Sequence, residues 1–87
     1  MIDLTQMRTF SSNEIYKFMR EMKDNTFKLW IYLHEKSKTN KFILKSPSLI
    51  SKDTGISSKG AFADTITELI SLGYMTVDEN KNLTICI

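Results

Sequence analysis

Apolar residues first take on a clear period between residues 11 and 24. Four of them recur at the i, i+3, i+4, i+7 spacing that places side chains on one face of a helix: Ile15, Phe18, Met19 and Met22. Ser11 and Glu14 have the spacing of a capping box, which begins a helix. We therefore predict an amphipathic helix over residues 11–24. Its apolar stripe either packs on the chain's own core or forms a dimer interface, because methionine adapts to many contact surfaces.

The stretch from residue 26 to residue 38 is apolar on nearly every side. Residues 27–33 include six apolar side chains, as in a helix that its neighbours bury on several faces. We predict a central helix contacted by the other helices, with Trp30 as its largest core residue and an indole N–H that needs a partner once buried. The residues 24–26 interrupt the pattern and are expected to cap this helix. His34, the only histidine, falls near its end, where the helix dipole favours it.

Residues 46–73 have the pattern of a short helix, a tight turn and a longer helix. Ser46 suits an N-cap, Pro47 the first helical position, and Gly55 a left-handed C-cap. Gly73 is expected to end the second helix. Apolar residues should form the inner side of both helices: Leu49 and Ile50 in the first, and Phe62, Ile66, Leu69, Ile70 and Leu72 in the second.

Three further segments are extended or weakly patterned. Residues 1–10 lack a period and are expected to be an arm, frayed or packed, or an edge strand. Residues 42–45 are short and β-like, with a register that leaves open whether Phe42 or Ile43 faces inward. Residues 74–87 predict a hairpin around turn residues 78–82. Alternate residues of its second strand should face inward, namely Leu83, Ile85 and Ile87. Cys86 is then expected on the other face or in a subunit contact.

Composition limits the class of protein. The 87 residues, 41% of them hydrophobic, suit one globular domain, here 1–87. Net charge is +2, but residues 1–46 hold nine Lys/Arg against five Asp/Glu, whereas residues 47–87 hold three against five. The single cysteine excludes an internal disulfide and favours a reducing, cytoplasmic setting. Residues 1–10 have no secretory pattern, and no apolar run approaches the roughly 20 residues that span a bilayer; we expect no membrane partner.

Residues 46–75 resemble the helix-turn-helix of bacterial winged-helix DNA-binding domains. The features that match are the turn Thr54-Gly55-Ile56-Ser57, the exit Leu72-Gly73-Tyr74, and the apolar residues Phe62, Ile66 and Leu69. With FKLWIYLHEKS and KFILKSPSLISKDTGIS upstream, residues 26–87 are similar to the N-terminal winged helix of phage and plasmid replication initiators from low-GC bacteria. The resemblance implies an α+β winged helix-turn-helix of about four helices. It also implies a small antiparallel sheet, in which the strand at 42–45 joins a wing formed by 74–87.

In such domains the second helix, here starting near Ser58, enters the major groove of DNA. The residues then expected to contact DNA lie at the two helix starts and the wing tip: Ser46, Ser48, Ser57, Ser58, Lys59, Gly60, Ala61, Ala63, Asp64, Thr67, Asn80, Lys81 and Asn82. The positive charge of Lys59 near the start of the helix is unfavourable by about 0.3–1 kcal/mol, because it faces the positive end of the helix dipole. Gly60 destabilises the helix by about 1 kcal/mol relative to alanine. A DNA phosphate beside Lys59 would make its positive charge favourable at this position. At Gly60, the absence of a side chain would let the helix backbone come close to the DNA backbone. The alternative is a solvated lysine and a tolerated glycine.

Two carboxylates on this helix, Asp64 and Glu68, depart from the family, many of whose members carry arginine or lysine there. They repel phosphates, although Asp64 could accept a hydrogen bond from a cytosine amino group. We therefore expect a weak contact from one subunit. Binding by a homodimer, or by several copies on repeated sites, would compensate. Phosphate contacts are expected from the helix starts and from four lysines: Lys45, Lys52, Lys59 and Lys81.

The sequence thus predicts a sequence-specific protein for double-stranded DNA, acting as a transcriptional regulator or a replication or partition factor. The alternative is a winged-helix adaptor that binds a host or replication protein through an exposed patch on the first helix. An enzyme is disfavoured by the lack of a triad pattern, a phosphate loop or a ligand cluster, and we expect no cofactor and no metal. A third reading stays open: because Ile87 ends the chain on an apolar strand, the sequence could be a domain excised from a larger initiator, although the starting methionine and the compact ending slightly favour a complete small protein.

Overall fold

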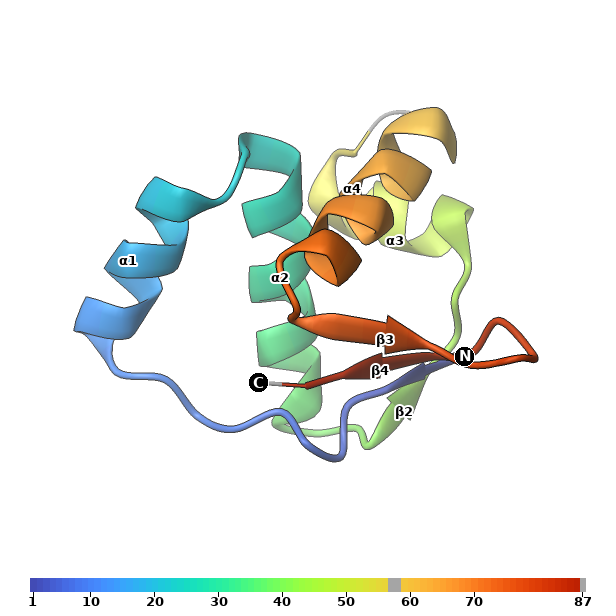
Figure 1. The fold of residues 1–87 in the computed structure, drawn as a ribbon, viewed down its shortest axis with the longest axis horizontal. Helices are drawn as coiled ribbons and strands as arrows, with labels where there is room; N and C mark the ends of the chain where they lie inside the picture. The colour runs from blue at the N-terminus through green and yellow to red at the C-terminus, as the bar shows by residue number, and fades with distance from the viewer. Residues whose placement is uncertain (57–58, 87) are drawn as a thin grey trace.

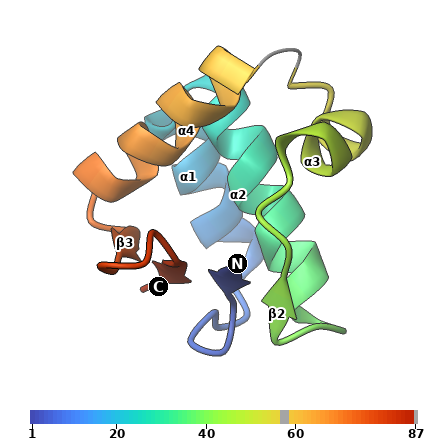
Figure 2. The same cartoon turned by 90° about the vertical axis from the view of Figure 1, so that its right-hand side faces the viewer.

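The computed structural model describes residues 1–56 and 59–86, which form an α+β fold of four helices and a four-stranded mixed sheet (Figure 1). The elements follow in this order: β1 (Ile2–Asp3), α1 (Ser12–Glu21), α2 (Asp24–Ser37), β2 (Phe42–Ile43), α3 (Pro47–Thr54), α4 (Lys59–Ser71), β3 (Met75–Val77) and β4 (Leu83–Ile85). In both views α3 and α4 lie on the same side of the sheet, and α2 runs past them (Figure 2). The predicted α+β class is confirmed.

The sheet has the strand order β2-β1-β4-β3, so the N-terminal strand lies in its interior. β1 pairs antiparallel with β2, Ile2 opposite Ile43, and parallel with β4, Ile2 opposite Leu83. The frayed arm and the edge strand expected for residues 1–10 are therefore wrong, whereas the packed alternative agrees with the burial of Leu4 and Phe10. Ile2 is completely buried, and its partners come from positions far along the chain. A strand of two residues is too short to show an alternating hydrophobic pattern, so its pairing with distant strands cannot be predicted from the sequence.

The predicted hairpin at residues 74–87 is confirmed as β3 and β4, paired antiparallel with Met75 opposite Ile85. The strand predicted at 42–45 forms as β2, but it does not join this hairpin, because β1 stands between them. Phe42 faces solvent and Ile43 packs against the core, which settles the inward face. Leu83 and Ile85 are buried and Cys86 is exposed, as the alternation predicted; Ile87 lies outside the described residues.

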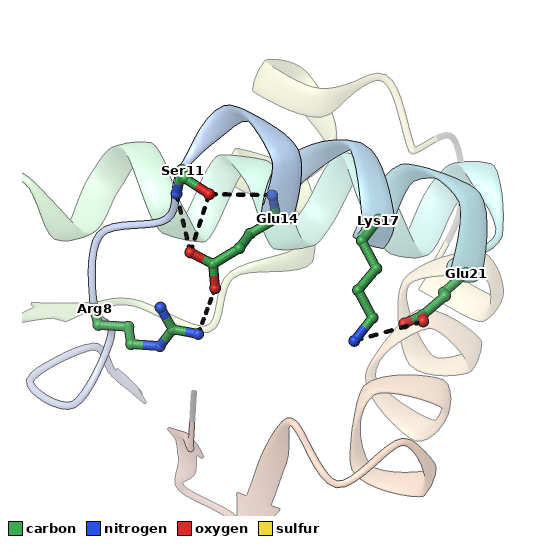
Figure 3. A network of polar contacts seen from close by, with 5 residues as sticks. All are labelled: Arg8, Ser11, Glu14, Lys17 and Glu21. Atoms are coloured by element: carbon green, nitrogen blue, oxygen red, sulfur yellow. Dashed lines mark hydrogen bonds and ion pairs between the residues drawn. The ribbon is translucent and has the colours of Figure 1, made fainter.

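Helix α1 begins with the predicted capping box. Ser11 Oγ accepts from the Glu14 backbone N–H at 3.3 Å, while Glu14 Oε1 accepts from the Ser11 N–H at 3.2 Å. Arg8 reaches back and donates to Glu14 Oε2 at 2.7 Å (Figure 3). The Arg8 hydrogen bond first, and the Ser11 N–H second, lower the pKa of Glu14 to about 2. Along the same helix Lys17 lies 3.9 Å from Glu21, where α1 ends, three residues earlier than predicted.

The apolar stripe of α1 is divided between the core and the surface. Phe18 and Met22 are buried within the single chain, and Ile15 is half-buried and packed against the core. Met19, in contrast, is 52% exposed. Packing on the chain's own core therefore accounts for Phe18 and Met22, which a partner subunit could not reach in this arrangement. A dimer interface at α1 stays a prediction for Ile15 and Met19.

Helix α2 is the central element, as predicted. It contacts α1, α3 and α4, and Leu29, Trp30 and Leu33 are completely buried. Its start differs from the prediction: the helix begins at Asp24, and no side chain of the N-cap residue Lys23 closes it. Instead Glu68 of α4 accepts from the Lys23 backbone N–H at 3.4 Å, so that a distant residue supplies the cap.

An aromatic cluster surrounds Trp30. The rings of Phe10, Phe18 and Phe27 have their centroids between 4.6 and 6.0 Å from the indole, and the His34 ring stacks on it at 5.5 Å. His34 is buried, so this packing rather than the helix dipole alone accounts for its position. Within the described chain, Trp30 Nε1 and His34 Nδ1 have no hydrogen-bond partner. The expected partner for the indole N–H is thus not found among these residues.

Candidate nucleic-acid interface

Helix α3 is built as its sequence predicts. Ser46 Oγ accepts from the Leu49 N–H at 3.5 Å and lies 3.2 Å from Ser48 Oγ, with Pro47 in the first turn. Gly55 ends the helix in the left-handed conformation at φ 80°, and its N–H donates to the Ser51 carbonyl. Both predicted serines therefore stand at the start of α3, Ser48 exposed and Ser46 half-buried.

Helix α4 separates its two faces clearly. Its inner side holds four buried residues: Phe62, Thr65, Ile66 and Leu69. Five of the predicted DNA-contacting residues face solvent: Lys59, Gly60, Ala63, Asp64 and Thr67. Ala61 differs from these five, because it is half-buried and packed against the core, and its contact with DNA stays a prediction. Ser57 and Ser58 lie outside the described residues.

The end of α4 follows the prediction at Gly73 and departs from it at Leu72. Gly73 takes φ 81°, and its N–H donates to the Ile70 carbonyl while the Tyr74 N–H donates to that of Leu69. These bonds close the last turn and direct the chain into β3. Leu72, however, is 42% exposed, since it precedes this left-handed residue on the outer side of the turn.

The exposed side of α4 borders a polar groove that it shares with the start of α2. Asp64, Thr67 and Glu68 line this groove from α4, opposite Lys23 and Asp24. Lys23 Nζ lies 3.6 Å from Glu68 Oε2, which leaves Asp64 and Asp24 without an ion pair in the described residues. The groove is therefore acidic on balance. Phosphate groups would be repelled from this part of the helix and less so from its first turn, where Lys59 stands.

The turn between β3 and β4 is held by Asp78. Its Oδ1 accepts from the backbone N–H groups of Asn80 and Asn82 at 2.8 and 2.9 Å. Lys81 adopts a left-handed φ of 62° at the tip, and its side chain is exposed. Asn82 Oδ1 lies 3.5 Å from the N-terminal ammonium of Met1, so the turn is also anchored to β1. The three predicted contact residues, 80–82, are all exposed.

Four lysines near these surfaces carry no ion pair within residues 1–56 and 59–86. They are Lys45, Lys52, Lys59 and Lys81. In contrast, Lys17, Lys23 and Lys38 are paired with carboxylates. The carboxylate of Asp53, next to Lys52 in the sequence, accepts a hydrogen bond from the Tyr32 hydroxyl at 3.1 Å. Burial first, and the bond to Asp53 second, raise the pKa of Tyr32. The unpaired ammonium groups are thus available to anions.

Sequence reasoning missed a second exposed feature beside α3. Phe42, Leu44 and Leu49 are each more than half exposed and line one groove. Leu49 was expected on the apolar side of α3, but only its neighbour Ile50 is buried. The signal in the sequence was the distribution of charge: residues 36–52 contain five lysines and no carboxylate, in a stretch that also holds five large aliphatic and aromatic residues.

The described residues offer little support for other kinds of site. Within them, no cluster of three or more His, Cys, Asp or Glu side chains could hold a metal ion. None of the helices among residues 1–56 and 59–86 has the length and apolarity needed to cross a bilayer. Comparisons of the chain with protein-family models, with curated proteins and with solved structures yield no match. Its function must therefore be inferred from the fold class and from the surfaces described above.

Proposed function

We propose that the chain is a winged-helix protein that binds double-stranded DNA, with the first turns of α4 in the major groove. The element order α2-β2-α3-α4-β3-β4 is the order that a winged helix requires, with the β3–β4 hairpin as the wing. β1 is an addition that inserts between β2 and β4. The proposed role is that of a transcriptional regulator or a replication or partition factor.

The observation that carries this proposal is the outer face of the start of α4. Lys59, Gly60 and Ala63 are exposed there and small apart from the lysine, so that a helix backbone can approach the floor of a groove. Phe62 and Ile66, on the opposite side, fix the helix to the core. Ser48 at the start of α3 and Lys81 at the wing tip would meet the phosphates on either side.

The acidic groove limits which residues of α4 can contact DNA. Asp64 and Glu68 lie in the second and third turns of α4, and Glu68 forms an ion pair with Lys23. The main contact would therefore come from residues 59–63, and affinity for one copy would be low. A homodimer, or several copies on repeated sites, would raise the overall affinity without new contacts in each copy.

Fluorescence anisotropy of labelled duplex DNA, titrated at several salt concentrations, tests this proposal. We expect log K to fall linearly with log salt, with a slope of about −0.9 for each phosphate contacted. Lys59→Ala should reduce that slope by about 1, equally for all duplex sequences if the contact is to phosphate. Lys17→Ala, which removes an exposed lysine of α1, serves as the matched control and should leave the slope unchanged. A slope near zero in the wild type would refute DNA binding.

A second candidate function is a protein-binding adaptor, favoured by one observation on α1. Tyr16 and Met19 are both more than half exposed on this helix and form an apolar surface of the kind that partner proteins cover. This function predicts partners that survive nuclease treatment of a lysate and no salt-dependent affinity for DNA. Met19→Asp should then abolish capture of those partners, whereas Lys59→Ala should not.

A further inference from the structure

An apolar groove with a basic rim lies between α2, β2 and α3, away from the start of α4. Three of its side chains are exposed to an unusual degree for their size: Phe42 by 52%, Leu44 by 71% and Leu49 by 55%. Tyr32 of α2 and Ile50 of α3 also line it, and Ile50 is buried. Exposed apolar side chains gathered in one place mark a surface that another molecule covers.

The charge around this groove has one sign. Lys36 lines it, with Nζ at 5.5 Å from the Tyr32 ring, and Lys41 is exposed next to Phe42. Across residues 36–52 the sequence holds five lysines and no carboxylate. Of the two flanking carboxylates, Glu35 is paired with Lys38 at 3.1 Å, and Asp53 accepts a hydrogen bond from the hydroxyl of Tyr32. Asp53 keeps its negative charge, but it does not line the groove, whose one charged lining residue among those described is Lys36. A ligand that fits must therefore combine apolar side chains with negative charge.

Backbone geometry adds a third requirement. β2 is at the end of the strand order, so within the described sheet it pairs only with β1. An edge strand can accept a further strand, whose alternate side chains then enter pockets beside it. Extended chain is thus the conformation that the groove can pair with. We propose that this groove docks an extended, acidic segment of a partner protein, with its apolar side chains between Phe42, Leu44 and Leu49.

The same observations disfavour other occupants. On α1 of a second copy, Tyr16 and Met19 are flanked by Lys17 and Arg20, which the basic rim would repel. Pairing through the other edge strand, where exposed Val77 precedes Asp78 and Glu79, would appear as an oligomer in solution and would overturn the proposal. Nucleic acid supplies the charge and could stack bases on an aromatic ring, but it offers no aliphatic groups to bury against two exposed leucines. The inference does not rest on DNA binding, because the residues that carry it are different from those at the start of α4.

Selection from a displayed library of short random peptides, with the full chain as bait, tests the proposal. The expected result is enrichment of peptides with net negative charge and alternating apolar residues. Affinities of the enriched peptides are then measured by fluorescence anisotropy. Leu49→Asp should weaken them by about tenfold or more, the loss that truncating a central contact residue causes. Lys36→Glu should weaken them as well, and more at low salt than at high salt.

Neither variant removes a core side chain, because Leu49 is exposed and Lys36 is half-buried. An aspartate at Leu49 enters the first turn of α3, where negative charge is favourable to the helix, so folding should persist and circular dichroism will verify it. Leu72→Asp makes the same change at an exposed leucine outside the groove, serves as the matched control and should leave affinity unchanged. No enrichment, enrichment of basic peptides, or equal affinity for Leu49→Asp would overturn the proposal. Displacement by single-stranded oligothymidine would assign the groove to nucleic acid instead and would overturn it too.

Discussion

Glu14 shows how strongly a few neighbouring residues can determine local structure. It accepts from Arg8 and from the backbone and side chain of Ser11, all within six positions along the chain. These contacts fix the start of α1 and favour the charged carboxylate (Figure 3). The pKa of Glu14 falls from 4.5 to about 2 for this reason, with the Arg8 hydrogen bond as the largest cause.

At this scale we predict a dependence of stability on pH. Because the pKa of Glu14 is lower in the folded chain than its usual 4.5, its contribution is present above that value and is lost as pH falls toward 2. Glu14→Gln should therefore lower the urea midpoint near neutral pH and match the wild type at about pH 2. Glu79→Gln, a change to an exposed carboxylate in the β3–β4 turn, is the control and should show no such convergence. A constant difference between Glu14→Gln and the wild type at every pH would contradict the assignment.

Among the elements, β1 has an effect out of proportion to its length. Its two residues connect β2 to the β3–β4 hairpin, and Leu83 donates its N–H to the Met1 carbonyl at 3.0 Å. Ile2 is completely buried between the sheet and the helices, beside Leu4. Without this strand, β2 would lose its one partner in the described sheet and β4 would lose one of its two, so the N-terminus is a part of the core.

Ile2→Ala tests the role of β1. Truncating a fully buried isoleucine leaves a cavity, and we expect the free energy of unfolding to fall by about 2–5 kcal/mol. Urea denaturation measures this change. Gln6→Ala, at an exposed position in the segment that follows, should change it by less than about 0.5 kcal/mol. If Ile2→Ala had as small an effect as Gln6→Ala, residues 1–10 would behave as a frayed arm, one of the alternatives that the sequence left open.

For the molecule as a whole, the distribution of charge restricts where an anion can approach. The acidic groove between α4 and the start of α2 contains Asp24, Asp64 and Glu68, with Lys23 as its one cation among the lining residues. The lysines of residues 36–52 lie instead in the segment that runs from the end of α2 past β2 to α3. Two surfaces of opposite sign thus lie on one small fold, and each would favour a partner of the opposite charge.

Removing one charge from the acidic groove distinguishes repulsion from base recognition. If Asp64 only repels phosphates, Asp64→Asn should strengthen binding to every duplex, by about 0.2–1 kcal/mol as for exposed charge pairs. If Asp64 accepts from a cytosine amino group, the same change should weaken binding to some sequences only, by about 1–3 kcal/mol. Anisotropy titrations on a panel of duplexes measure both. Glu21→Gln, which removes an exposed carboxylate of α1 outside the proposed interface, is the control and should leave the affinities unchanged.

The sequence by itself determined the elements whose causes are local. The Ser11–Glu14 box, the Ser46 cap with Pro47, and the left-handed turns at Gly55 and Gly73 all close within a few residues, so each could be predicted from its spacing. The inner face of α4 followed from its helical period, and that face also determines which of its residues are exposed. Most of the predicted interface at α3, α4 and the hairpin therefore lies at the surface, where the pattern placed it.

Tertiary structure alone decided the features that depend on distant partners. Three features of this kind depend on contacts between residues far apart in sequence. They are the interior position of β1, the hydrogen bond from the Lys23 N–H to Glu68 at the start of α2, and the burial of Phe18 and Met22. The exposure of Phe42, Leu44 and Leu49 is of the same kind, because a side chain's surroundings depend on which elements pack beside it. A pattern of apolar positions records which face of an element can be buried. Only the packing of the complete chain determines whether a neighbour is present to bury it.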